Sequence, residues 1–495
     1  MRWRVMRKDY DVIICGGGTS GIAAAIASAR TGAKTLLIER NGSIGGQMNV
    51  SGPPGFSYAH LFNPRGEQVI AGIIEETHAR LVQEGHGTPH NHHPYREGTG
   101  YTFSYIDPEW WCLLMFQMMT ENDVDLLLHT LVVGVTKKEN AVNGVIVENT
   151  NGRIELRAKV VIDCTGEGDI AVRAGCDYEM VSREDSEPHS VCFTLDGIHW
   201  DEWLEYVHAH PEEISDFATE HPNQINLNAA ESHSGDDHMN LVRSITNPLD
   251  YGEVMGFSAL RDKAIANGDW HEYAGVGFFF TPKNDGSKHI QAHCQHSAQV
   301  PNLLSTDAWD LSRAEIECRR QIAIAANFFR KYMPGFQDSY IAKMGVELRL
   351  REGRRIVGDY RITREDVISG ARFYDCIGKS AFAAGDIHVA NANTLGSGPN
   401  GSEKPKDGGT HDIPYRCMVP QKVENLLVAG KHVSTDRDAY MRFLQETMVT
   451  GQAAGTAAAL CVKNNVSPRG LEAPEYIGQL QSELRRQGVI LDGVH

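Results

Sequence analysis

In the first forty residues, short apolar runs alternate with runs of small residues. The run DVIIC is short, apolar and β-branched, which predicts a strand buried on both faces. A glycine-rich turn and the alanine-rich segment GIAAAIASARTG follow, and they predict a helix that stops at Gly32. The apolar run KTLLIER then predicts a second strand, which ends at Glu39.

Later segments repeat both kinds of pattern. Between Leu126 and Val161, three apolar runs alternate with the polar turns KKEN and NTNG, which predicts an antiparallel meander at a sheet edge. Asp107 and Pro108 are typical of a helix start, and Ser312 with Glu315 predicts a capping box for a helix that ends before Pro334. NLLVAG predicts another buried strand, and GQAAGTAAAL predicts a helix of small residues.

Composition limits the classes of protein that fit. A chain of 495 residues is long enough for two or three domains, and its net charge of −17 disfavours nucleic acid and anionic membranes as partners. No apolar run approaches about 18 residues, so we expect no membrane span. The basic start runs into the glycine turn after a short apolar stretch, which fits a first strand better than a signal peptide. The ten cysteines form no C-x-x-C pair, which favours a reducing cytoplasm.

The glycine turn has the spacing of a dinucleotide site. Gly16, Gly18 and Gly21 form G-x-G-x-x-G, in which the glycines permit a tight turn, close approach to a pyrophosphate and close packing of helix on strand. Glu39 follows where a carboxylate accepts bonds from ribose hydroxyls. Because this acid would repel a 2′-phosphate, the residues exclude NADP and leave NAD and FAD open.

A second glycine pair, Gly45-Gly46, resembles the pair beside the FAD pyrophosphate in flavoproteins of the glutathione-reductase structural group. The segments AKVVIDCTGEGDIAVRAGC, LRLREGRRIVGDYRI, HDIPYRCMVP and VENLLVAGK resemble, in order, those of the FAD-dependent oxidoreductase family. The resemblance implies FAD as cofactor and a helix whose N-terminus, near Gly451 and Gln452, faces the flavin. With the turn, it gives these candidate cofactor-binding residues: Gly16, Gly18, Thr19, Ser20, Gly21, Glu39, Arg40, Gly45, Gly46, Gln47, Val133, Thr165, Gly166, Asp169, Gly430, Gly451 and Gln452.

The chain departs from the family pattern at two positions. Lys431 stands where the family has arginine, and Gly353 replaces a polar residue in R-E-x-R-R. The expected fold is α/β: a Rossmann-like FAD-binding domain, with a parallel sheet and an antiparallel β-meander, plus a second α+β substrate or cap domain. We assign the FAD-binding domain to 8–180 with 423–465, the substrate domain to 181–422, and a C-terminal tail to 466–495.

The candidate catalytic residues are His411, Tyr415, Arg416 and Arg351. The resemblance returns the segment HDIPYR to the flavin edge, where His411 would transfer a proton and Tyr415 and Arg416 would bind an oxygen. The alternative is structural: a turn cap at His411 and an ion pair at Arg416. Arg349 and Arg351, on one face of a predicted strand, either clamp a carboxylate or form ion pairs between domains.

Three further features stay open. Asp386 and His388 would share a strand face, either as a carboxylate that orients an imidazole or as a structural pair. The loop with His86, His90, His92 and His93 carries H-x-H-H, but no acid or cysteine nearby completes a ligand set, so we predict no metal. The segment 391–412 is either a lid or a surface insertion.

The function expected is an FAD-dependent oxidoreductase that transfers a hydride between a small organic substrate and the flavin. A single G-x-G-x-x-G and no C-x-x-x-x-C disfavour a pyridine-nucleotide disulfide reductase. The alternative is a flavoprotein in which FAD has a structural or binding role. The substrate, the direction, the electron acceptor, covalent attachment of FAD and the oligomeric state, a homo-oligomer included, stay open.

Overall fold

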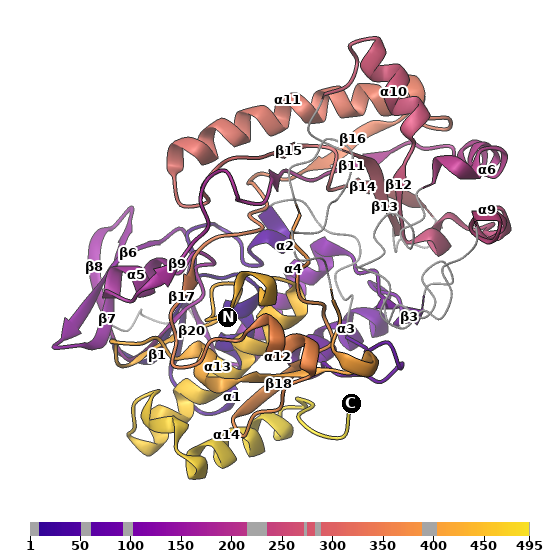
Figure 1. The fold of residues 1–495 in the computed structure, drawn as a ribbon. Helices are drawn as coiled ribbons and strands as arrows, with labels where there is room; N and C mark the ends of the chain where they lie inside the picture. The colour runs from indigo at the N-terminus through magenta and orange to yellow at the C-terminus, as the bar shows by residue number, and fades with distance from the viewer. Residues whose placement is uncertain are drawn as a thin grey trace.

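The computed structural model describes residues 9–50, 61–92, 102–214, 235–271, 275–282, 289–388 and 403–494. They form two units with separate hydrophobic cores, one around a mostly parallel sheet and one around an antiparallel sheet (Figure 1). The expected α/β class with a second α+β unit is confirmed. Among these residues, none of the helices has the length and apolar character that a membrane crossing requires.

The first unit is built on a seven-stranded sheet in the order β5-β2-β1-β8-β7-β6, with β20 also paired to β8. Strand β8 pairs with both parts of the sheet: its first half is antiparallel to β7, and its second half is parallel to β1 and β20. This confirms the predicted meander, and it brings the carboxyl ends of β1, β2, β8 and β20 to one edge. The strands are β1 (Asp9–Cys15), β2 (Thr35–Ile38), β5 (Asp125–Leu127), β6 (Leu131–Lys138), β7 (Ala141–Asn149), β8 (Gly152–Asp163) and β20 (Leu426–Val428).

Helices pack on this sheet, and two of them approach closely. Gly455 of α13 faces α1, and a Cβ there would lie 2.8 Å from Ala24 Cα, so only glycine permits this distance. The expected start of α4 is confirmed, since Asp107 accepts hydrogen bonds from the N–H groups of Glu109 and Trp110. The helices are α1 (Thr19–Arg30), α2 (Gln47–Val50), α3 (Ile73–Gln83), α4 (Pro108–Glu121), α5 (Asp169–Ala174), α12 (Arg364–Ser369), α13 (Leu444–Asn464) and α14 (Pro474–Arg486).

The second unit is an antiparallel sheet in the order β12-β13-β14-β11-β16, with the long helix α11 across the top of Figure 1. Its core is rich in aromatic rings, including Trp203, Phe278 and Phe280, which meet edge to face. Its elements are α6 (Trp200–Ala209), α9 (Gly235–Ser244), α10 (Ser258–Ala266), α11 (Ala308–Tyr332), β11 (Phe193–Asp196), β12 (Glu253–Gly256), β13 (Val276–Pro282), β14 (Ile290–Cys294) and β16 (Tyr340–Met344).

Helix α11 begins four residues earlier than the sequence predicts. Asp307 is the N-cap and accepts hydrogen bonds from the N–H groups of Trp309 (2.9 Å) and Asp310 (3.2 Å). Ser312 lies inside the helix and donates to Ala308 O, so the capping box predicted there is wrong. The predicted end before Pro334 is confirmed.

The hydrophobic cores give a different division of the chain from the sequence. The second core uses residues from Val191 to Leu348, whereas Ile356, Ile413 and Met418 pack in the first core. By this criterion the second unit ends near residue 350 rather than at 422. The segment predicted as a tail also joins the first core, through Leu480 and its neighbours on α14.

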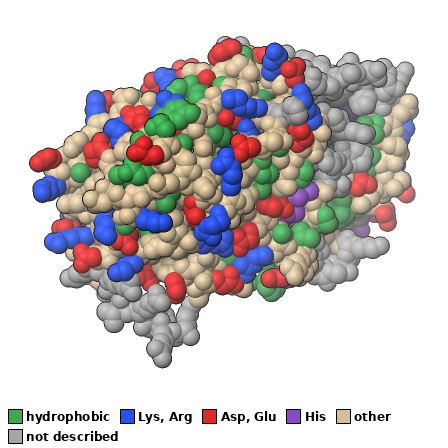
Figure 2. All heavy atoms as spheres, turned by 90° about the horizontal axis from the view of Figure 1, so that it is seen from below, with side chains coloured by type: hydrophobic (Ala, Val, Ile, Leu, Met, Phe, Trp, Pro, Cys, Tyr) green, Lys and Arg blue, Asp and Glu red, His purple; other side chains and the backbone are tan. Residues whose placement is uncertain are grey.

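The remaining elements are short. The small strand pairs are β3 (Asn91–His92) with β4 (Thr102–Phe103), β9 (Tyr178–Glu179) with β17 (Arg355–Ile356), β10 (His189–Ser190) with β15 (Gln299–Val300), and β18 (Cys376–Ser380) with β19 (His411–Pro414). The 3-10 helices are Pro211–Glu213, Pro248–Tyr251, Lys406–Gly408, Tyr415–Met418, Arg437–Ala439 and Gly470–Glu472. On the face seen from below, Figure 2 shows basic and acidic side chains interspersed.

Candidate active site

The glycine turn lies at the carboxyl edge of the parallel sheet and is joined by the second glycine pair. Gly45 N donates to Gly17 O at 2.7 Å, and a Cβ at Gly46 would lie 2.8 Å from Gly18 Cα. Gly16 has φ +105°, and a Cβ there would lie 3.1 Å from Thr165 Cα. These three stretches form one glycine cradle (Gly16–Gly18, Gly45–Gly46 and Gly166), which allows a ligand to approach backbone N–H groups closely.

Glu39 ends the second strand and points into the cradle. Its Oε2 accepts from Gly17 N at 2.7 Å and its Oε1 from Asn41 N at 2.9 Å. The neighbouring Arg40 is exposed and forms an ion pair with Glu347 at 2.5 Å, so its side chain points toward the second unit. The predicted candidate Gln47 also points there, donating to Leu350 O.

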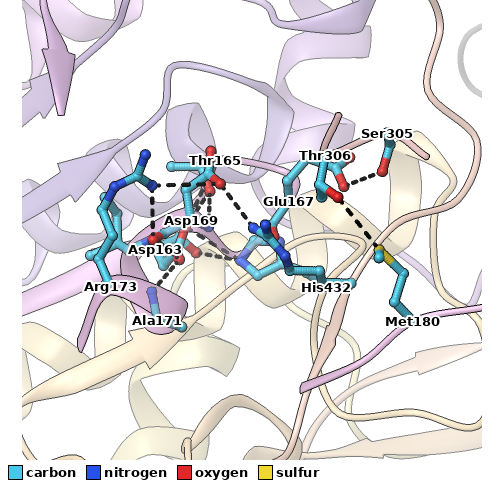
Figure 3. A network of polar contacts seen from close by, with 12 residues as sticks. Asp163, Thr165, Glu167, Asp169, Ala171, Arg173, Met180, Ser305, Thr306 and His432 are labelled. Carbon is cyan, nitrogen blue, oxygen red and sulfur yellow. Dashed lines mark hydrogen bonds and ion pairs between the residues drawn. The ribbon is translucent and has the colours of Figure 1, made fainter. Parts of the chain in front are cut away.

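The floor of the cradle is a hydrogen-bond network around Asp163 (Figure 3). Its carboxylate accepts from Thr165 N (3.0 Å), Thr165 Oγ1 (2.7 Å), Ile170 N (2.9 Å) and Ala171 N (2.8 Å). Burial opposes the charge, but His432 and the backbone donors outweigh it and lower the pKa of Asp163. This network fixes the turn that presents Gly166, whose φ is +84°.

Three predicted cofactor residues lie near the sheet, and the side chains of two of them bind other residues of the chain. Thr165 directs its hydroxyl into Asp163, and Asp169 forms an ion pair with Arg354 at 2.9 Å. Val133 lies at a register shift of β6, outside the paired residues.

Helix α13 begins at Leu444, so the expected helix start near Gly451 is wrong. Gly451 lies further along and faces α1, where a Cβ would lie 2.8 Å from Ser20 Cα, and Gln452 accepts from Ile73 N at 2.9 Å. The helix N-terminus instead carries buried Gln445 and Glu446. Burial raises the pKa of Glu446 to about 7.

Two further candidates connect α13 and β20 to the cradle. Gly430 follows β20 with φ +101°, and its N–H donates to Thr450 Oγ1 at 3.0 Å. Thr19, the first residue of α1, meets Thr447 of α13 through their hydroxyl groups at 2.7 Å. The N-termini of α1 and α13 are therefore held against each other.

A second group of polar side chains is buried between the two units, and we call it the interdomain cluster. Arg442 forms an ion pair with Glu187 at 2.5 Å, and the other oxygen of Glu187 accepts from His388 N at 2.9 Å. Arg351 donates to Pro188 O at 2.5 Å and lies 3.4 Å from His296 Nδ1. The cluster comprises Glu187, His189, His296, Arg349, Arg351, Asp386, His388 and Arg442.

The electrostatics of the cluster keep its imidazoles neutral. Burial, together with the positive charges of Arg351 and Arg442, lowers the pKa values of His189, His296 and His388 well below the usual value. In the described part of the chain, His189 Nε2 and His388 Nδ1 have no hydrogen-bond partner. Each of these buried nitrogens can therefore bond a ligand.

The cluster borders the glycine cradle through one ion pair. Lys431, which follows Gly430, pairs with Glu167, and Ser305 of the second unit donates to the other oxygen of Glu167 at 2.6 Å. Lys431 also contributes to the lowered pKa of His189. Lys431 therefore lies between the polar cluster and the cradle.

The structure does not bring the segment HDIPYR into this cluster. Tyr415 is buried in the first core and donates to Pro468 O at 2.9 Å, and Arg416 pairs with Asp375 at 3.0 Å. Both side chains have structural partners, as the alternative interpretation of Arg416 expects, and the catalytic roles of Tyr415 and Arg416 stay predictions. His411 is buried on β19, where burial lowers its pKa to about 4, and its catalytic role stays a prediction.

Arg351 is the one catalytic candidate that lies in the cluster. Burial and the charge of Arg349 lower the pKa of Arg351 to about 9. Arg349 donates to Gln295 at 2.5 Å, and the two arginines come from an extended segment rather than the predicted strand. Asp386 and His388 also lie outside any strand.

The sequence missed the other members of the cluster. Glu187, His189, His296 and Arg442 are far apart in sequence and carry no local motif. The one usable signal was the pair Asp386 and His388. Of the predicted lid, residues 391–402 lie outside the described part of the chain, as does His93.

A model of the family described as "FAD dependent oxidoreductase" matches residues 11–484. The chain belongs to this family. The enzyme is therefore an FAD-dependent oxidoreductase, and the glycine cradle with Glu39 fits the cofactor, since the cradle leaves no side chain between backbone N–H groups and a pyrophosphate.

Individual relatives match parts of the chain. A digeranylgeranylglycerophospholipid reductase of Methanoculleus marisnigri is 29% identical over 182 residues, which cover 36% of this chain and 44% of the relative. The enzyme of that name in Thermoplasma acidophilum is 25% identical over 192 residues, or 36% and 45% of the two chains. The match thus spans less than half of these relatives.

Solved structures align over a larger part of the chain. A geranylgeranyl bacteriochlorophyll reductase-like protein of Thermoplasma acidophilum aligns with 98% of this chain and 88% of its own, at 12% identity and a TM-score of 0.43. A flavin-dependent brominase aligns with 97% and 84%, at 12% identity and a TM-score of 0.44.

Proposed function

We propose that the enzyme oxidises an alcohol, or reduces the corresponding carbonyl compound, at the interdomain cluster. The observation that carries this proposal is the pair of buried, neutral imidazoles whose free nitrogens are His189 Nε2 and His388 Nδ1. A neutral imidazole is a proton acceptor for a hydroxyl group, and two of them can hold both the oxygen and its proton.

The remaining members of the cluster position the reacting groups. Glu187 holds Arg442 and the backbone of His388, so it fixes the imidazole relative to the guanidinium. Arg351 lies where it stabilises negative charge that develops on the substrate oxygen. When bound, FAD supplies the hydride acceptor or donor. The cradle residues Gly16, Gly18, Glu39, Gly45, Gly46 and Gly166 would hold it.

Anaerobic flavin reduction tests the proposal. The FAD-loaded enzyme is mixed with panels of alcohols, hydroxy acids and allylic lipids, and loss of the visible flavin absorbance is followed. We expect an alcohol to reduce the flavin and His388→Ala to slow this step by about 100-fold or more. His199→Ala is the matched control, because His199 is half-exposed and pairs with Asp338 at the surface.

Two outcomes would contradict the proposal. Wild-type rates in both His388→Ala and His189→Ala would show that the free imidazoles take no part. Reoxidation of chemically reduced flavin by a geranylgeranyl lipid, with no alcohol able to reduce the oxidised flavin, would instead favour the activity that the names of the archaeal relatives state for those proteins.

We also propose that the enzyme works in a reducing compartment, the cytoplasm. Its ten cysteines are free thiols, and nine of them are buried. Cys15 and Cys164 lie on neighbouring strand ends and stay reduced, which fits a compartment that keeps thiols reduced.

A further inference from the structure

A second cluster of ligand-type side chains lies on and beside α3, and it shares no residue with the glycine cradle or the interdomain cluster. Glu75 and His78 are one helical turn apart and project from the same face of α3, and His90 comes from the segment that leads into β3 (Figure 1). Their ligand atoms all lie within 4.8 Å of one another. The sequence analysis found no acid for the histidine loop because Glu75 precedes it by fifteen residues.

The distances inside the cluster match those around a small cation. His90 Nε2 lies 2.9 Å from Glu75 Oε2, and His78 Nδ1 lies 3.6 Å from Glu75 Oε1. Ligand atoms about 2.1 Å from a tetrahedral ion are roughly 3–3.5 Å apart, so small adjustments admit one. The two imidazole rings are stacked, with centroids 3.8 Å apart, which keeps both on the same side of the carboxylate.

Each of the three side chains also has a hydrogen-bond partner outside the cluster, as metal ligands in proteins do. His78 Nε2 donates to the carbonyl of Thr88 at 2.9 Å, which turns Nδ1 toward Glu75 Oε1. His90 Nδ1 is 3.3 Å from Ser104 Oγ, and Gln68 Nε2 donates to Glu75 Oε2 at 2.8 Å. Partners of this kind orient the ligands and fix the tautomer.

Burial and charge favour a cation at this place. His78 is buried, and Glu75 and His90 are partly exposed, which leaves an entry path and room for a water ligand. Two imidazoles and one carboxylate, with a fourth position open, are a donor set for zinc and related first-row ions.

We propose that Glu75, His78 and His90 bind a divalent cation of the zinc class. The ion joins α3 to His90, seven residues beyond the end of that helix. The site is separate from the interdomain cluster and does not depend on the proposed function.

Zinc binding to the FAD-loaded, chelator-treated enzyme tests this assignment. After dialysis against zinc, elemental analysis of the wild type should find about one ion per chain more than in Glu75→Gln or His90→Gln. Ser104→Ala keeps all three ligands but removes a hydroxyl that orients His90, so zinc affinity should fall about tenfold. A purely structural contact between His90 and Ser104 would not produce this fall.

Matched controls separate the site from other surface ligands. Glu84→Gln changes an exposed acid at the end of α3, and His86→Gln changes a histidine that stacks on Trp110 outside the cluster. Both should bind zinc as the wild type does, and all variants should keep their flavin absorbance. The proposal is overturned if the wild type binds no zinc, or if the ligand variants bind as much as the controls.

Discussion

The glycine cradle allows a sharp test of how FAD is held, through the substitution Gly46→Ala. Gly46 has φ +54°, and its added Cβ would lie 2.8 Å from Gly18 Cα. The neighbour is backbone, which cannot rotate away as a side chain can. The loop that contains Gly45 and Gly46 must therefore move away from the first glycine turn.

The size of the effect follows from two contributions. A left-handed conformation costs a residue with a Cβ about 1–2 kcal/mol in folding stability. Restoring ordinary contact requires a shift of roughly 0.6–1.2 Å between the loops. At a preorganised site, a misplacement of about 1 Å is enough to lower the reaction rate by about two orders of magnitude. We therefore expect FAD affinity to fall by at least about tenfold, or 1.4 kcal/mol.

The measurement is titration of the apoprotein with FAD, followed by flavin fluorescence. Gly32→Ala is the matched control, because Gly32 has φ +102° but a Cβ there meets nothing within 4 Å. It should lose folding stability and keep its FAD affinity within about twofold. Unchanged FAD affinity in Gly46→Ala, or an equal loss in Gly32→Ala, would refute the reasoning.

Three other predictions concern buried polar groups. Glu187→Gln leaves Arg442 only its longer ion pair with Asp386, at 3.6 Å, and should lower the free energy of unfolding by up to about 3 kcal/mol in urea titrations, whereas Glu184→Gln at a nearby exposed position should have little effect. Tyr415→Phe removes only a bond to Pro468 O, so it should cost about 1 kcal/mol of stability and leave turnover unchanged; a large loss of turnover would support the catalytic role predicted for Tyr415. Burial raises the pKa of Glu446 to about 7 in the folded state, so the unfolded chain loses this proton at lower pH than the folded chain does. The free energy of unfolding therefore falls as pH rises from about 4.5 to 7. Glu446→Gln should remove this fall, and parallel stability–pH curves for variant and wild type would contradict it.

The cofactor half of the site could be predicted because its contacts are local in sequence. Gly16, Gly18, Gly21 and Glu39 belong to one strand–turn–helix–strand unit, and their spacing predicts the part of the cradle that this unit contributes. The start of α13 could not be placed in the same way. Alanine-rich residues after Gly451 signal a helix strongly, whereas the β-branched residues before it have lower helix propensity, and packing against α1 extends the helix through them.

The positions of the proposed catalytic residues depend on contacts between segments that are far apart in sequence. Arg416 is bonded to Asp375, forty-one residues away, and Tyr415 to Pro468, fifty-three residues away. The family resemblance placed these polar residues near the flavin. It could not show that Pro468 and Asp375 bind their side chains in the folded chain. The interdomain cluster was invisible for the same reason, since five separated segments meet there only when both units are folded.

The two departures from the family pattern turn out to be connected by one carboxylate. Lys431 pairs with Glu167, and a Cβ at position 353 would lie 2.8 Å from Glu167 Cδ, so Gly353 leaves the space that this carboxylate occupies. Glu167 in turn accepts a hydrogen bond from Ser305 of the second unit, beside the open backbone of Gly166. A side chain at position 353 would displace Glu167 and leave the ammonium of Lys431 without this acid. The glycine and the lysine are therefore linked through Glu167, which lies between the cradle and the interdomain cluster.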